Sequence, residues 1–232
     1  MTVYMVALPE SISCRNSKRY LAEHLRLPRT VKRVEEEAFL RQEKIKSITF
    51  PDGLTSIGAG AFQGCIHLKE LVLPDSLLSM EKEVFSGCRD LSSVRLSSAL
   101  NNIPDRAFYK CRKLTQIDFP EGLRKIGAEA FYFAGISELR IPSTVTTIKD
   151  RAFFRCSQLT SVKLPSNVTR IGSEVFHGCN QLKTLEIAYD PIYIGERIVN
   201  RSTKIRCYEG SIVDAYCQKN EIPTEYIVDK HS

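Results

Sequence analysis

Apolar residues recur along most of this chain with a fixed period. The clearest marker is a phenylalanine, which is separated from the next by 23 residues in five of six steps and by 22 in the other. The marker occupies positions Phe39, Phe62, Phe85, Phe108, Phe131, Phe153 and Phe176. A fixed period of this size predicts a stacked repeat protein, in which each unit contacts only its neighbours.

Each unit also carries a Leu-x-x-Leu-x-Leu segment, such as Leu68 to Leu73, which is followed by Pro74. The last two apolar residues flank one outward position, which is polar in the other units and Val72 in this one, and this period of two predicts a half-buried strand. Proline ends the strand because it cannot donate to a ladder. One strand per unit, always in the same direction, predicts a parallel sheet with right-handed connections. A second, shorter extended piece, such as Leu54 to Ile57, precedes an expected tight turn at Gly58.

The Ala-Phe-x-x-Cys segment of each unit predicts one helical turn with its Phe pointing inward, so that the rings stack into a hydrophobic spine. Five cysteines share one position, three residues after the Phe: Cys65, Cys88, Cys111, Cys156 and Cys179. No Cys-x-x-Cys pair suggests zinc, so we expect these thiols to be free and packed as small hydrophobes. Cys14, Cys207 and Cys217 lie outside this series, and a Cys207–Cys217 bridge stays open.

The fifth unit, which begins its turn at Phe131, is one residue shorter and lacks the cysteine. We expect a tightened turn with Ala134 or Gly135 in place of the thiol, and a functional bend is the alternative.

The ends of the chain lack the repeat. We predict an N-terminal cap over residues 1–24, an array of about seven units over 25–188, and a C-terminal cap over 189–232. The first cap is expected to hold a strand over 3–8 and a short helix over 17–24, begun by the Ser17 hydroxyl. The second is expected to hold a loop with a short helix over 189–201, a strand over 204–207, a helix capped by Ser211 and a last strand over 224–228.

Charge and hydropathy narrow the classes of function. The net charge is +6 with a pI near 8.9, and the charged residues are scattered; nucleic-acid binders cluster theirs, so nucleic acid is not expected. No apolar run approaches the roughly 18 residues that span a bilayer. The N-terminus lacks the features of a signal peptide, and unpaired cysteines favour a reducing, cytoplasmic compartment.

The unit from Leu54 to Pro74, with Ile57-Gly58, Ala61-Phe62, Gly64-Cys65 and Leu68-x-x-Leu71-x-Leu73, resembles the BspA-type leucine-rich repeat. The resemblance covers roughly residues 25–188 and implies a curved, right-handed solenoid. It also implies protein binding and adhesion, because many such proteins lie on the surface of host-associated bacteria and some protists. The resemblance therefore favours the cell surface, whereas the unpaired cysteines favour the cytoplasm, so the location of the protein stays open. The family offers no catalytic residues to transfer.

No catalytic constellation stands out, and we expect neither a cofactor nor a metal. There is no Gly-x-Ser-x-Gly motif, phosphate-binding loop or His-x-x-x-His pair. His67 and His177 fall at different repeat positions and are expected to be exposed turn residues. Cys179 is close to His177 but belongs to the packing series, which argues against a nucleophile there.

Recognition would fall to the strand residues that point out of the sheet. Stacked strands lie about 4.8 Å apart, so side chains from several units converge on one partner. The candidates on this concave face are Arg26, Thr49, Glu70, Val72, Arg95, Gln116, Asp118, Glu138, Arg140, Lys163 and Glu186.

The sequence therefore predicts a monomeric leucine-rich-repeat solenoid that acts as a non-enzymatic protein-binding module, with a protein partner of unknown identity. The alternatives are a segment of a cell-surface adhesin that binds host or matrix proteins, and an enzyme with an unrecognised site.

Overall fold

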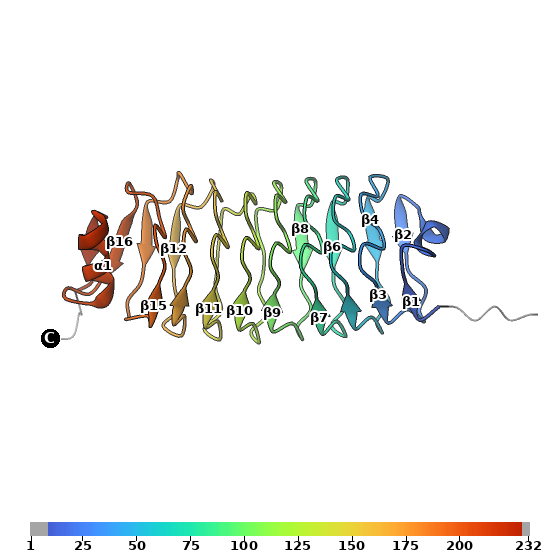
Figure 1. The fold of residues 1–232 in the computed structure, drawn as a ribbon, viewed down its shortest axis with the longest axis horizontal. Helices are drawn as coiled ribbons and strands as arrows, with labels where there is room; N and C mark the ends of the chain where they lie inside the picture. Colours follow the sequence, from blue (N-terminus) through green and yellow to red (C-terminus); the bar gives the residue numbers. More distant parts are fainter. Residues whose placement is uncertain (1–8, 229–232) are drawn as a thin grey trace, which may run out of the picture.

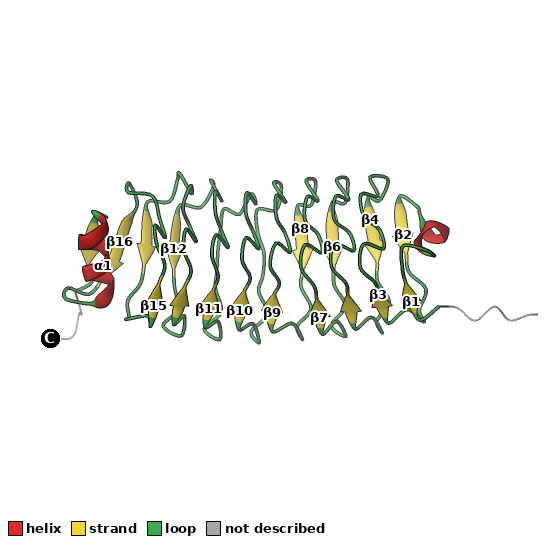
Figure 2. Ribbon diagram, viewed as in Figure 1, coloured by secondary structure: helices red, strands yellow, loops and turns green. Residues whose placement is uncertain are grey.

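The computed structural model describes residues 9–228, so the strand expected over residues 3–8 lies outside the described part. Figure 1 shows an elongated body in which the chain winds turn by turn from one end to the other. Two rows of short strands run along this body, joined by loops and turns (Figure 2). Each repeat of the sequence therefore forms one turn of a solenoid.

The first row of strands contains the predicted Leu-x-x-Leu-x-Leu segments. Pairing is parallel, and partners such as Leu25 and Ile48 are one repeat apart. In the three-residue strands that carry the repeat pattern, the middle residue is buried and its neighbours face outward, whereas the middle residue of the last strand, Glu225, is exposed. We call this row the first sheet. Its strands are β2 (His24–Arg26), β4 (Ser47–Thr49), β6 (Glu70–Val72), β8 (Ser93–Arg95), β12 (Ser161–Lys163), β14 (Thr184–Glu186), β16 (Lys204–Cys207) and β17 (Thr224–Tyr226).

The first sheet is interrupted between β8 and β12. The strand predicted around Ile117 is reduced to one bridge between Arg95 and Asp118, and the strand predicted around Leu139 is absent. The interruption coincides with the shortened fifth unit, where a Cβ on Gly135 would clash with the carbonyl oxygen of Arg112. Ile117 and Leu139 still point inward and are buried. The alternation of inward and outward residues therefore survives the loss of regular pairing.

A second row of two-residue strands, which we call the second sheet, lies along the opposite edge of each turn, and its pairing is interrupted between Met80 and Asn102. Its inward residue is usually isoleucine, as at Ile57 and Ile126, both fully buried. Its strands are β1 (Ser11–Ile12), β3 (Arg33–Val34), β5 (Ser56–Ile57), β7 (Ser79–Met80), β9 (Asn102–Ile103), β10 (Lys125–Ile126), β11 (Thr147–Ile148), β13 (Arg170–Ile171) and β15 (Tyr193–Ile194).

The solenoid extends beyond the segment in which the repeat can be read. Strand β15 pairs with β13 and β16 pairs with β14, so another turn follows residue 188. The short helix expected within residues 189–201 is not there. At the other end, β1 lies inside the segment predicted as a cap and pairs with β3 of the array. These end turns keep the backbone pairing while their side chains depart from the pattern.

The Ala-Phe-x-x-Cys segments form consecutive β-turns and not the predicted helical turn. The residues two before and two after the Phe are left-handed, as at Arg106 (φ 57°) and Lys110 (φ 58°). Their N–H groups donate to carbonyls of the next turn, for example Lys110 to Tyr132 at 2.7 Å. These bonds offset the cost of about 1–3 kcal/mol of a left-handed non-glycine residue. A helical turn would instead have formed its backbone hydrogen bonds within its own repeat unit.

The phenylalanines form the predicted spine. All seven are fully buried, and consecutive rings lie 5.2–5.8 Å apart with interplanar angles of 3–12°. Offset stacking of this kind adds to the gain from burial. The spine therefore couples each turn to the next along the whole array.

The five repeat cysteines are free and buried, as predicted. Each thiol donates to the carbonyl oxygen of the preceding unit's spine Phe, as Cys88 does to Phe62 at 3.3 Å. Burial raises the pKa of Cys65 and Cys179 to about 12. In the fifth unit the buried Ala134 takes the place of the thiol. Cys207 and Cys217 are also free and buried, and their side chains are hydrogen-bonded to each other.

This arrangement predicts the reactivity of the thiols. At pH 8 an aromatic disulfide reagent should react rapidly with only Cys14, the exposed one of eight cysteines. The other seven should react only after unfolding, because a buried thiol forms little thiolate and excludes the reagent. Rapid release of more than one equivalent from the folded protein would contradict this burial.

Short helices lie at both ends. The 3-10 helix η1 (Ser17–Tyr20) is shorter than predicted, and the Ser17 hydroxyl donates to the carbonyl of Cys14 instead of capping it. Helix α1 (Ile212–Asn220) begins as predicted, with the Ser211 side chain accepting from the N–H of Asp214. Figure 1 shows α1 at the C-terminal end of the body.

Candidate functional site

The outward residues of the first sheet form one continuous surface, which we call the first-sheet face. It contains every residue selected from the sequence. Ten are exposed and the last, Glu186, is half-buried: Arg26, Thr49, Glu70, Val72, Arg95, Gln116, Asp118, Glu138, Arg140, Lys163 and Glu186. Gln116, Asp118, Glu138 and Arg140 belong to the interrupted segment and still face outward.

Several charges on this face are already paired. Arg95 binds Asp75 at 2.9 Å, and Glu186 accepts from Lys163 at 2.8 Å and from Arg206 at 2.6 Å. Hydrogen bonds from the backbone and hydroxyl of Ser98, then from Arg95, lower the pKa of Asp75. Ion pairs therefore hold the charged side chains of the first-sheet face in place at β8 and around β14.

Other residues on the first-sheet face are not committed to the fold. Arg26, Asp118 and Arg140 make no ion pair within residues 9–228. Val72 is 55% exposed next to Arg95 on the neighbouring strand. An exposed apolar side chain next to arginine is the composition found at the centre of protein interfaces.

A second feature, absent from the sequence-based prediction, lies on the turns that carry the spine. The residue after each spine Phe is aromatic in four consecutive units: Tyr109, Tyr132, Phe154 and His177. The first two ring pairs stack at 4.9 Å each, the third, Phe154 with His177, is tilted by 33° at 5.8 Å, and all four rings are half-buried. We call them the aromatic ladder. Four successive Phe-aromatic pairs were the signal in the sequence that could have revealed it.

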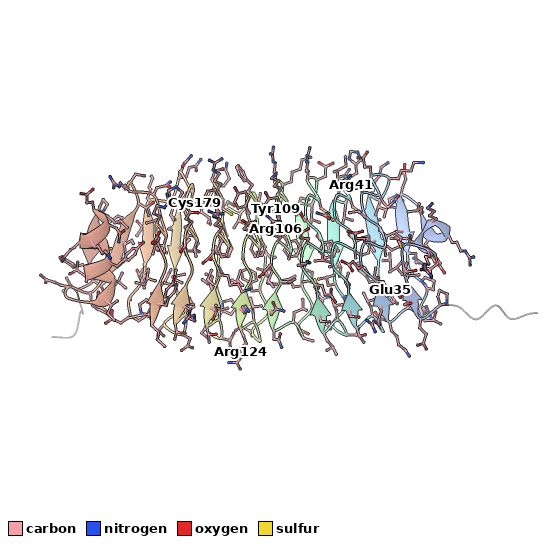
Figure 3. The ribbon with its side chains drawn as sticks, in the orientation of Figure 1. Glu35, Arg41, Arg106, Tyr109, Arg124 and Cys179 are labelled. Carbon is pink, nitrogen blue, oxygen red and sulfur yellow. The ribbon has the colours of Figure 1, made fainter. Side chains whose placement is uncertain are left out.

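An ion ladder runs beside the aromatic ladder. It is formed by left-handed residues of six consecutive turns. Five of them lie two residues before a spine Phe, and the sixth lies two residues before Val199, which follows the spine in the next turn. In order they are Glu83, Arg106, Glu129, Arg151, Glu174 and Arg197. Neighbours pair at 3.1, 2.7, 3.8, 2.6 and 2.7 Å. The hydrogen bond from Arg151 lowers the pKa of Glu174. Figure 3 shows Arg106 and Tyr109 close together in the same part of the molecule.

The structure argues against nucleophilic chemistry at Cys179. Its thiol donates to the carbonyl of Phe153 at 3.2 Å, and burial raises its pKa to about 12. His177 is half-buried against Phe154 and is not the exposed turn residue that was predicted, whereas His67 is exposed and bonds Asp90 at 3.0 Å. Residues 9–228 contain no group of three His, Cys, Asp or Glu suited to a metal and no helix long and apolar enough to cross a membrane.

Comparisons with known proteins agree with this architecture. The model of the BspA type leucine rich repeat region matches residues 15–133 and 81–206. The crystal structure of a Treponema pallidum leucine-rich-repeat protein is 24% identical with a TM-score of 0.57, covering 75% of this chain and 73% of that one. A Bacteroides ovatus leucine-rich-repeat protein is 23% identical with a TM-score of 0.51, covering 84% of this chain and 64% of its own. No curated protein matches the chain. At these identities the likeness shows the fold alone.

Proposed function

Because the chain belongs to the BspA-type leucine-rich-repeat family, we propose that it is a non-enzymatic protein-binding module whose contact surface is the first-sheet face. The observation that carries the proposal is the exposure of this face. Outward residues from many consecutive turns form one surface, on which Val72 is 55% exposed and neither Arg26 nor Arg140 makes an ion pair among residues 9–228.

The size of the first-sheet face suits a protein partner. Strands about 4.8 Å apart over several turns give a surface about 30 Å long. A specific interface needs roughly 800 Å² on each partner, which a surface of this length can supply. The region from Val72 to Arg140 combines an exposed apolar side chain with arginines, so we assign the centre of the contact to it.

A pull-down from an extract of the organism that makes the protein tests the proposal. The variant Arg95→Glu, Arg140→Glu, Lys163→Glu should lose most of its partner, about tenfold or more, because it reverses charge across the face. The matched control is Arg33→Glu, Lys125→Glu, Arg170→Glu, which changes three charges of the same sign on outward positions of β3, β10 and β13. Equal capture by the two variants would contradict the proposal.

The adhesin alternative uses the same face and differs in location and partner. Detection of the protein on intact cells, with binding to host or matrix proteins, would favour it. Binding only to partners from inside the producing cell would oppose it.

A further inference from the structure

Three residues beside the aromatic ladder form a second candidate binding site. Lys110, Phe133 and Arg155 occupy the same repeat position, two residues after the spine Phe, in three consecutive units. All three are left-handed, with φ values of 58°, 57° and 57°. Because their backbone conformations match, their side chains leave the turns in parallel. We call them the turn-edge triad.

The aromatic member of the triad is unusual for its position. The equivalent residues in other units include Gly64, Gly87 and Gly178, which adopt positive φ without strain. A left-handed phenylalanine is uncommon and strained. Phe133 keeps this conformation and packs between Tyr132, at 5.1 Å between ring centroids, and Arg155, whose guanidinium lies 5.0 Å from the ring centroid.

The positive charges of the triad are not neutralised. Lys110 lies over the Tyr109 ring at 4.9 Å and Arg155 over the Phe154 ring at 5.5 Å, and neither makes an ion pair in the described part of the chain. The acidic side chains of the ion ladder are paired within it: Arg106 and Arg151 bind Glu129, and Arg151 and Arg197 bind Glu174. The triad therefore presents two free cations on either side of an aromatic ring.

A hollow of about 500 Å³ continues the triad toward the C-terminus. It is lined by Phe133, Phe154 and Arg155 on one side and by His177, Asn180 and Asn200 among its polar residues. The His177 Nδ1 atom is buried without a hydrogen-bond partner. The site thus offers polar groups next to the cations and is not a flat surface.

Two modes of binding are excluded by the geometry. Tyr132 lies between Tyr109 and Phe154, each at 4.9 Å, so bases of a single-stranded nucleic acid cannot stack on the middle of the ladder. The N–H groups of Lys110, Phe133 and Arg155 all donate to the next turn, at 2.7, 2.9 and 2.9 Å. They cannot pair with an added β-strand. A partner must bring a backbone that needs no hydrogen bonds from this edge.

A polyproline II helix is one backbone that meets this requirement and has a matching spacing. Lys110 and Arg155 are two turns apart, and the two ring separations of 4.9 Å between Tyr109, Tyr132 and Phe154 give a spacing of about 10 Å between equivalent positions on these turns. In a polyproline II helix the residues i and i+3 point the same way about 9 Å apart, and the backbone stays solvated. Aromatic-lined surfaces commonly bind this conformation.

We propose that the turn-edge triad binds an acidic protein segment in the polyproline II conformation, with carboxylates at positions i and i+3 paired with Lys110 and Arg155 and an apolar residue against Phe133. This site is separate from the first-sheet face and does not depend on its function.

Fluorescence anisotropy with the intact protein tests this inference. The probe is a short fluorescein-labelled peptide of repeated Glu-Pro-Pro units, which places glutamates three residues apart. A peptide of repeated Gln-Pro-Pro units should bind at least tenfold more weakly, because each charge-assisted pair is lost. A peptide of alternating Glu and Pro, with the wrong spacing, should be weakened several-fold.

Variants locate the binding. Lys110→Glu with Arg155→Glu should weaken the Glu-Pro-Pro peptide at least tenfold. Phe133→Gly should weaken it several-fold without lowering Tm, because glycine is unstrained at this φ. The matched control, Arg41→Glu, reverses a charge at the equivalent position of the first unit, also left-handed at φ 54°, and should leave affinity unchanged. Equal binding of the Glu and Gln peptides, equal loss in the control, or tighter binding of an oligonucleotide than of the peptide would overturn the proposal.

Discussion

Replacing Phe108 by alanine is expected to lower the free energy of unfolding by about 3–5 kcal/mol. Phe108 is fully buried and stacked between Phe85 at 5.8 Å and Phe131 at 5.4 Å. Because each unit contacts only its neighbours, the cavity should also uncouple the two halves of the array. A urea titration followed by circular dichroism should show the loss of stability and a transition that broadens or splits.

Tyr109→Ala is the matched control for the spine. Tyr109 is the next residue and also stacks on a ring, Tyr132 at 4.9 Å, but it is only half-buried. We expect it to cost about 1 kcal/mol and to leave one transition. If Phe108→Ala cost no more than Tyr109→Ala, the spine would not be what couples the turns.

Raising the pH from 8.5 to 10 is expected to destabilise the protein by several kcal/mol. Burial raises the pKa of Cys65, Cys179 and Cys217 from the ordinary value of 9.0 to about 12, and raises that of Cys88 and Cys156 as well. Between about pH 9 and 12 these thiols ionise in the unfolded chain but stay protonated in the folded one. Their stabilisation is therefore complete below pH 9 and lost as the pH rises, by about 1.4 kcal/mol per thiol and pH unit.

Urea titrations at several pH values, with reductant present, measure this dependence. The variant Cys65→Ala should be less stable at pH 8 and should lose less stability between pH 9 and 10 than the parent, by about 1 kcal/mol. A stability that is constant up to pH 10 would mean that the thiols are not buried in the folded state.

The spine and the alternation of the first sheet could be predicted from the sequence because both depend on burial. An inward Phe108 or Leu71 must be apolar in every turn, so the period is visible. The left-handed turns could not be predicted, since glycine, charged residues and Phe133 all occupy the same position. Backbone hydrogen bonds to the next turn hold that position, and they leave no mark on residue type.

The pairing of the end turns could not be predicted for a related reason. Strand β15 pairs as the earlier strands do, but its outward residue is Tyr193. In the same turn the buried Val199 stands where the earlier turns have a spine Phe. A terminal turn has no further turn to cover, so its side chains are less constrained. The first-sheet face was predicted correctly as outward-facing, but pairs such as Arg95 with Asp75 depend on the loops and could not be read from alternation.

Arginine labelling of the complex shows whether a partner protein covers the first-sheet face. A dicarbonyl reagent with mass spectrometry compares Arg26, Arg95 and Arg140 on this face with Arg33, Arg124 and Arg170, exposed residues of the second-sheet side. Figure 3 shows Arg124 at the edge opposite Arg41. A partner bound to the first-sheet face should protect Arg95 and Arg140 and leave Arg33, Arg124 and Arg170 as reactive as in the free protein. Protection of the second-sheet arginines with Arg95 and Arg140 still reactive would contradict this expectation.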